Sequence, residues 1–158
     1  MDAKDQQAAQ ITCLQKNLSA IRKVAGWTSE QLGEKIGVTK QTISNLENEK
    51  TQMTLIQYIA LRSIIDFEIQ TNKDNLVLPQ VVEVLLNNYE EYTEKEREKV
   101  NENVKTIAAT ASGGITGTSL AALSAGLLAG ILKSPTATAT ATTAVWLAKI
   151  LNGKGKSK

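Results

Sequence analysis

The 158-residue chain contains no histidine. Because histidine is the commonest general base and a frequent ligand of zinc and iron, its absence argues against most acid–base and metal-dependent enzymes. The glycines of GGITG lack the lysine and the flanking strand of a nucleotide-binding loop. No pair of nucleophile and base and no cluster of metal-ligating residues is visible. The sequence therefore predicts a protein that is not an enzyme and that uses no cofactor and no metal.

Cysteine and aromatic residues are also scarce. The single cysteine, Cys13, has no partner for an internal disulfide, and without histidine it has no obvious activating base. We expect a buried structural thiol and a reducing, cytoplasmic setting. The chain has 2 Trp, 3 Tyr and 1 Phe, so aliphatic and small residues must form most of its core. This composition favours packed helices and an all-α fold.

Acidic residues are absent from the last third of the chain. Residues 1–105 hold 13 Lys and Arg and all 16 Asp and Glu, whereas residues 106–158 hold 5 Lys and no acid. Such a change of charge predicts a boundary between two regions.

The N-terminal region has the pattern of several short helices. Apolar residues recur at three- and four-residue intervals over Leu14–Ala25, which predicts one amphipathic helix. Thr28 or Ser29 can cap a second helix that ends at Gly37, and Thr39 can cap a third. Two short helices joined by a tight turn make a helix-turn-helix.

The segment WTSEQLGEKIGVTKQTISNLENEK resembles the helix-turn-helix core of phage Cro and repressor proteins, the XRE family. The resemblance covers Leu14 to Ile65 and includes the amphipathic segment TLIQYIALRSII, which closes a bundle of four to five helices. The family usually has Gln at the position of Ser29 and Ala at that of Gly33. The first difference removes a phosphate contact, and the second loosens a helix.

The resemblance implies that the protein binds double-stranded DNA, with the third helix in the major groove. Amide side chains can pair with adenine, lysine can pair with guanine, and threonine methyls can meet thymine. The residues expected to read bases are Thr39, Lys40, Gln41, Thr42, Ser44 and Asn45. Those expected to contact phosphates are Ser29, Asn48 and Lys50. Arg22 and Glu47 resemble the family's internal ion pair, which anchors the third helix.

The charge of the N-terminal region qualifies this expectation. Residues 1–70 contain 8 Lys and Arg and 8 Asp and Glu, so few counterions are released at phosphates. We then expect affinity to depend on a homodimer or higher oligomer. Two of its N-terminal helix-turn-helix regions would occupy the half-sites of a palindromic operator, about 34 Å apart. A neutral head is also compatible with a protein partner.

The middle region, residues 71–105, is expected to begin with a linker that stops at Pro79. An apolar stripe follows over residues 81–92, and Thr93 and Glu96 have the spacing of a capping box before a charged helix. The segment is a spacer, a dimerising element or a layer packed on the N-terminal bundle; the sequence leaves these alternatives open.

The C-terminal region, residues 106–158, is rich in alanine and glycine and predicts a helical hairpin with a basic tail. Ile107–Leu132 carries no charge and is long enough to cross a bilayer, which takes about 20 helical residues. Its many small residues make insertion marginal. Small residues at four-residue spacing allow close helix contacts in a membrane or an oligomer. They include Gly113, Gly117, Ala121, Ala125, Gly126 and Gly130.

The sequence thus favours a cytoplasmic, repressor-like regulator of transcription. Its C-terminal region would serve self-association or would attach the protein, through residues 107–151, to the inner face of the cell membrane. The alternative is a membrane-acting small protein, toxin-like or channel-like, whose helix-turn-helix regulates its own synthesis.

Overall fold

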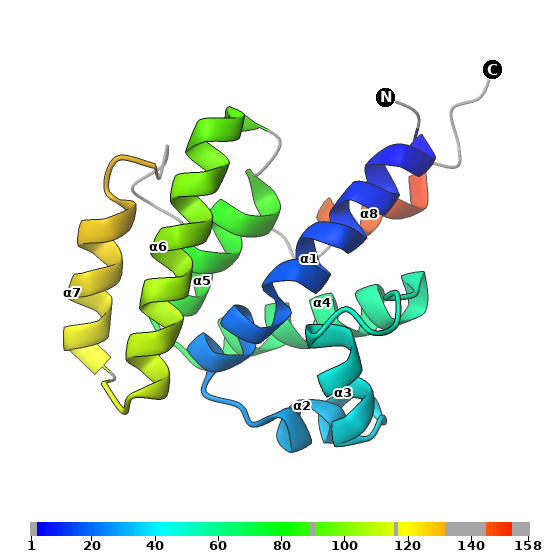
Figure 1. Ribbon diagram of the computed structural model, residues 1–158, viewed down its shortest axis with the longest axis horizontal. Coiled ribbons are helices and arrows are strands. Elements are labelled where there is room, and N and C mark those ends of the chain that lie inside the picture. Colours follow the sequence, from blue (N-terminus) through cyan, green and yellow to red (C-terminus); the bar gives the residue numbers. More distant parts are fainter. Residues whose placement is uncertain (1–2, 89–90, 116, 132–144, 153–158) are drawn as a thin grey trace.

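The computed structural model describes residues 3–88, 91–115, 117–131 and 145–152, and every regular element in these ranges is a helix (Figure 1). In chain order the elements are α1 (Ala3–Ala25), α2 (Ser29–Ile36), α3 (Lys40–Glu47), α4 (Leu55–Thr71), α5 (Val77–Val82), the π-helix η1 (Glu83–Asn87), α6 (Glu94–Ser112), α7 (Gly117–Leu128) and α8 (Val145–Asn152). The predicted all-α fold is confirmed.

Helix α1 lies at the centre of the fold. It begins at Ala3, eleven residues before the predicted start, and its buried face includes Leu14, Leu18 and Ile21. Figure 1 shows α2, α3 and α4 on one side of α1, and α5, α6 and α7 on the other. The buried side chains of all these helices form one continuous core.

Threonine caps begin the helices of the N-terminal bundle. The Oγ1 atoms of Thr28, Thr39 and Thr54 accept the backbone N–H three residues ahead, and each such cap stabilises a helix by about 1 kcal/mol. Helix α2 ends at Gly37, whose φ of 76° favours glycine. The caps at Thr28 and Thr39 and the stop at Gly37 were predicted correctly, whereas the cap at Thr54 was not predicted. Helix α4 extends to Thr71, further than the resemblance to the family implied.

Gly33 has a different role from the one expected. A Cβ atom at this position would lie 2.6 Å from the backbone oxygen of Val38. The glycine therefore allows the turn between α2 and α3 to approach α2 closely. The small residue is a packing requirement of this turn rather than a source of looseness.

The predicted linker up to Pro79 was wrong. Helix α5 begins at Val77, because Asn75 Oδ1 accepts hydrogen bonds from the N–H groups of Val77 and Leu78 at 3.2 and 3.1 Å. Pro79 lies in the first turn, where a missing N–H is tolerated. Val81 and Leu85 are fully buried, so this region packs on the N-terminal bundle, one of the three alternatives left open.

Helix α6 continues through the expected boundary at residues 105 and 106. The capping box of Thr93 and Glu96 begins it, as predicted, and it ends at Ser112. Val104 and Ile107, on either side of that boundary, are both buried against the rest of the core. The point after which acidic residues are absent therefore falls within one continuous helix.

The charge-free stretch from Ile107 is not a single helix. Two successive glycines, Gly113 and Gly114, follow α6, and Gly114 adopts a φ of 92° that ends it. Helix α7 then returns along α6, where Asn103 Nδ2 donates to the carbonyl of Leu127 at 2.9 Å. No helix among the described residues has both the length and the apolar character needed to cross a bilayer.

The predicted rows of small residues do not bring helices together within the described part of the chain. Helix α7 instead buries Leu120, Ser124 and Leu128, which are not in those rows. Added Cβ atoms at Gly126 and Gly130 would meet nothing within 4 Å there. Gly113, Gly117, Ala125, Gly126 and Gly130 are exposed, and Ala121 is half-buried. Whether they serve contacts between chains stays a prediction.

The described part of the second predicted arm is α8. Trp146 and Ile150 bury one face of this helix, and Trp146 packs beside Tyr58 of α4. The rest of the arm, including the alternating Thr/Ala run, lies outside the described residues, as does the basic tail.

Cys13 was expected to be buried; it is half-buried and is held as a structural thiol. Its Sγ donates to the carbonyl oxygen of Leu85 at 3.0 Å, and burial raises the pKa of the thiol from 9.0 to about 11. We expect a disulfide reagent at pH 8 to label the native protein about 100-fold more slowly than the guanidinium-unfolded chain, because the thiolate is the reacting species. Equal rates in the two states would contradict this burial.

The same shift makes stability depend on pH. The folded-state pKa of Cys13 lies above its unfolded value. The stabilisation is therefore complete below pH 9 and is lost as the pH rises towards 11.

Candidate nucleic-acid interface

Helix α3 presents a polar face to solvent because its apolar residues are used inside the bundle. Ile43 and Leu46 are fully buried, whereas Lys40 and Gln41 are exposed. Thr39 caps the helix, and its φ and ψ of −80° and 159° are extended. A short helix whose apolar face is packed in the bundle and whose polar face is exposed can enter the major groove of DNA.

Two amide side chains on the open face are joined. Gln41 Nε2 donates to Asn45 Oδ1 at 2.9 Å, one helical turn away. Each amide keeps further donors and acceptors, which is the pattern that matches the N6 and N7 edge of adenine. The contact holds both side chains over the same part of the helix before any ligand arrives.

The hydroxyl groups of the predicted set are already engaged. Thr39 Oγ1 accepts from the N–H of Thr42 at 3.1 Å and lies 3.0 Å from the Thr42 hydroxyl. Asn48 Nδ2 donates to the carbonyl of Ser44 at 2.9 Å and lies 3.3 Å from its hydroxyl. These contacts assign Thr39 and Asn48 to the two ends of α3, so both residues shape the helix whatever else they contact.

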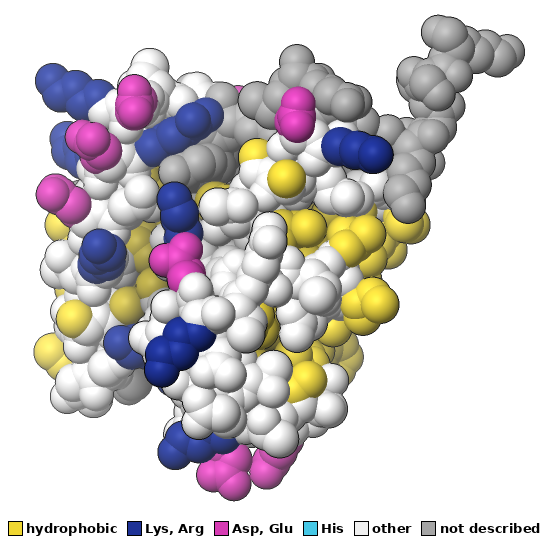
Figure 2. Space-filling model, turned by 45° about the vertical axis from the view of Figure 1, so that its right-hand side comes forward, with side chains coloured by type: hydrophobic (Ala, Val, Ile, Leu, Met, Phe, Trp, Pro, Cys, Tyr) yellow, Lys and Arg dark blue, Asp and Glu magenta, His cyan; other side chains and the backbone are white. Residues whose placement is uncertain are grey.

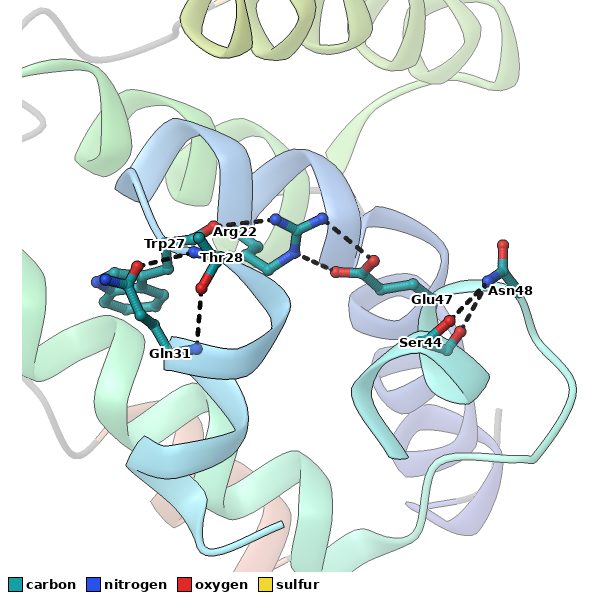
Figure 3. A network of polar contacts seen from close by, with 7 residues as sticks. All are labelled: Arg22, Trp27, Thr28, Gln31, Ser44, Glu47 and Asn48. Atoms are coloured by element: carbon teal, nitrogen blue, oxygen red, sulfur yellow. Dashed lines mark hydrogen bonds and ion pairs between the residues drawn. The ribbon is translucent and has the colours of Figure 1, made fainter. Parts of the chain in front are cut away.

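The predicted pair of Arg22 and Glu47 is present (Figure 3). The guanidinium donates to both carboxylate oxygens, at 2.5 and 3.3 Å, and also to the carbonyl of Trp27 at 2.9 Å. Arg22 and Glu47 side chains are only 13% and 11% exposed. The pair therefore ties the end of α3 to α1 and to the turn before α2.

Gln15 also positions α3, and the sequence did not reveal it. Its amide Nε2 donates to the carbonyls of Leu46 at 3.0 Å and Thr51 at 2.7 Å, while its Oε1 accepts from the N–H of Met53 at 3.0 Å. The side chain is buried. A glutamine beside Leu14 on an amphipathic helix looks like a surface residue, so no local signal could have found it.

The predicted phosphate contacts flank α3. Ser29 is the first residue of α2, and Lys50 follows α3 through Glu49, whose φ is 56°. The N–H of Lys50 donates to the carbonyl of Asn45 at 2.9 Å, which closes the turn and leaves the lysine exposed. Ser29 therefore lines the same cleft as Lys40 at the start of α3, and Lys50 lies just beyond the end of that helix.

The surface around this site carries both signs of charge. Figure 2 shows basic and acidic side chains next to each other at the lower end of the molecule. This agrees with the equal numbers of acidic and basic residues in residues 1–70. The described residues contain no group of three or more Cys, Asp or Glu that could hold a metal ion.

Comparison with known proteins agrees with this geometry. Residues 18–67 match the family model described as Helix-turn-helix. Residues 18–67 are an XRE-type helix-turn-helix domain. Over 50 residues the chain is 36% identical to "Antitoxin HipB" of Escherichia coli (strain K12). No solved structure matches the chain significantly.

The match covers only part of each protein. It covers 32% of this chain and 57% of the antitoxin, so the chain spans little more than half of that relative's length. What the comparisons support is a DNA-binding helix-turn-helix over residues 18–67. The helices after residue 67 lie outside the matched region.

Proposed function

We propose that the chain is a sequence-specific, repressor-like regulator of transcription that acts in the cytoplasm on double-stranded DNA. The joined amides of Gln41 and Asn45 on the exposed face of α3 are the observation that carries this proposal. The helix that bears them is anchored from the other side by Arg22 and Gln15. A rigid helix with two ordered amides is suited to reading bases in the major groove.

Binding would divide the site into two kinds of contact. Lys40, Gln41, Ser44 and Asn45 would face base edges, while Ser29 and Lys50 would bind phosphates on either side. The methyl groups of Thr39 and Thr42 would remain available to thymine, because capping uses their hydroxyls and not their carbons. Asn48 would add a phosphate contact at the end of α3.

Two helix-turn-helix domains, one from each chain of a dimer, are needed for useful affinity. A head with equal numbers of acidic and basic residues gains little from phosphates in general, so a homodimer on a palindromic operator would combine two weak sites. Self-association through the C-terminal helices would supply that dimer. Membrane attachment and the membrane-acting alternative stay predictions, because residues 132–144 lie outside the described residues.

Replacing Gln41 by Ala tests the readout. We expect Gln41→Ala to lower discrimination between the preferred operator and its adenine-substituted variants by about 1–3 kcal/mol, because one bidentate contact is lost. Selection from randomised duplexes, followed by gel-shift titration of the selected site, measures this.

Gln70→Ala is the matched control, since Gln70 is an exposed glutamine on α4. It should bind as the unmodified protein does. An unchanged sequence preference for Gln41→Ala would remove this residue from base reading. Absence of any preferred sequence in the unmodified protein would contradict the proposed function itself.

A further inference from the structure

An open cleft of about 600 Å³ lies between the helix-turn-helix domain and the end of α6. The end of α1, the turn that follows it and the starts of α2 and α3 form one wall, and the end of α6 forms the other. Its lining includes Lys23, Ser29, Lys40, Ala111 and Ser112. The cleft therefore joins part of the matched family region to a segment that the family model does not cover.

The position of α6 beside this cleft is held by packing. Val100, Val104 and Ile107 of α6 are buried, and α6 and α1 are in extensive contact. Figure 1 shows the end of α6 at the same end of the molecule as the turn between α1 and α2. Ser112 therefore has a defined place relative to Ser29 rather than belonging to a loosely attached arm.

The charges of the cleft suit a polyanion. Lys23 and Lys40 are exposed side chains on its head wall, whereas Arg22 is already bound to Glu47. One acid, Glu30, lies among the lining residues. On the α6 wall the lining consists of a small apolar residue and a hydroxyl, which let a phosphate backbone approach without repulsion.

The cleft is also continuous with the surface assigned to DNA. Ser29, proposed to bind phosphate, and Lys40, proposed to face the bases, both line it. A DNA strand that touches both residues must pass the opposite wall of the same cleft. This continuity favours the backbone of bound DNA over a separate small anion.

We propose that the end of α6 is a second wall of the DNA-backbone site, with the Ser112 hydroxyl donating to a phosphate next to the one bound by Ser29. This inference rests on the proposed function. It extends the DNA footprint beyond the helix-turn-helix and gives a helix outside the matched region a direct part in binding.

Tethered cleavage tests the location. In the full chain with Cys13→Ser, Ser112→Cys carries an iron–EDTA reagent, and Ser63→Cys on α4 is the matched control at another exposed serine. We expect the reagent at position 112 to cut the backbone at the edge of each selected half-site and the reagent at position 63 to leave it intact. Equal cutting by both, or none from position 112, would overturn the inference.

Charge substitutions test the contact by an independent readout. A new carboxylate about 4 Å from a phosphate in water costs enough for about a fivefold weaker affinity. We therefore expect Ser112→Glu to weaken binding about fivefold on any duplex, and Ser112→Lys to strengthen it and to steepen the salt dependence by about one ion. Ser63→Glu should have a smaller effect.

The outcomes separate this inference from the proposed function. If the unmodified protein selects a sequence and Gln41→Ala loses it, but Ser112→Glu matches Ser63→Glu, only the role of α6 fails. If the substitutions change the binding of inorganic phosphate but not of DNA, the cleft is a small-anion site and the inference also fails. If no duplex is bound, the proposed function fails first.

Discussion

Replacing Trp146 by Ala is expected to lower the free energy of unfolding by about 3–5 kcal/mol, the usual cost of removing a large aromatic side chain from a core. Trp146 is 8% exposed, and its ring meets that of Tyr58 edge to face with centroids 6.0 Å apart. Arg62 lies over the indole at 5.5 Å, and the indole N–H donates to Asp66. Three contacts between α8 and α4 thus depend on one side chain.

The hydrogen bond between the Trp146 indole and Asp66 can be tested separately with a second variant. Burial raises the pKa of Asp66, while Arg62 and the indole N–H act against this rise. Trp146→Phe keeps the aromatic edge but leaves the carboxyl of Asp66 without its indole donor. We expect it to cost about 1–3 kcal/mol, because a hydrogen bond to a charged group is lost while the ion pair with Arg62 remains, and therefore less than Trp146→Ala.

Urea unfolding followed by circular dichroism measures both variants. Leu151→Ala is the control on the same helix, because Leu151 is 56% exposed and its truncation should change stability by less than about 0.5 kcal/mol. If Trp146→Ala and Leu151→Ala unfold alike, α8 does not anchor to α4 as described.

Removing Glu47 is expected to destabilise the helix-turn-helix domain by about 3 kcal/mol, because the guanidinium of Arg22 would stay buried without its carboxylate. The two side chains are 13% and 11% exposed, so solvent screens the pair little. Glu47 belongs to α3, and its loss should also weaken operator binding by loosening the helix that reads the bases.

A double-mutant cycle isolates the pair. Arg22→Ala, Glu47→Ala and the double variant are unfolded in parallel, and the double variant should be less destabilised than the sum of the single ones. Glu34→Ala, at an exposed position of α2, is the matched control. Strict additivity of the two single variants would show that the ion pair contributes nothing to the stability of α3.

Local signals were sufficient for the helix-turn-helix itself. Thr28, Gly37 and Thr39 act through bonds that reach at most four residues, so their effects follow from nearby sequence. The pairing of Arg22 with Glu47 spans 25 positions and was found because the family resemblance supplied it. Spacing could not have joined these two residues.

Local signals were misleading where contacts between distant segments decide. Pro79 indicated a linker, yet Asn75 caps a helix before it and also donates to the carbonyl of Val24 at 2.9 Å. The small residues of the C-terminal region indicated close helix contacts, but α7 packs through Leu120 and Leu128. The linker prediction failed because a contact with a distant segment places Asn75 at the start of a helix, whereas contacts of the small residues with another chain stay a prediction.

By itself the sequence determined the helical class, the threonine caps, the two short helices with their turn, and the absence of histidine chemistry. These properties depend on composition and on bonds within one or two turns. The tertiary structure alone decided that Gln15 and Arg62 are buried, that α6 crosses the change of charge, and that Ser112 lies beside the cleft with Lys40. Each of these features follows from packing between segments that are far apart in the chain. The burial of apolar faces decides which polar residues such packing encloses, and local periodicity does not reveal it.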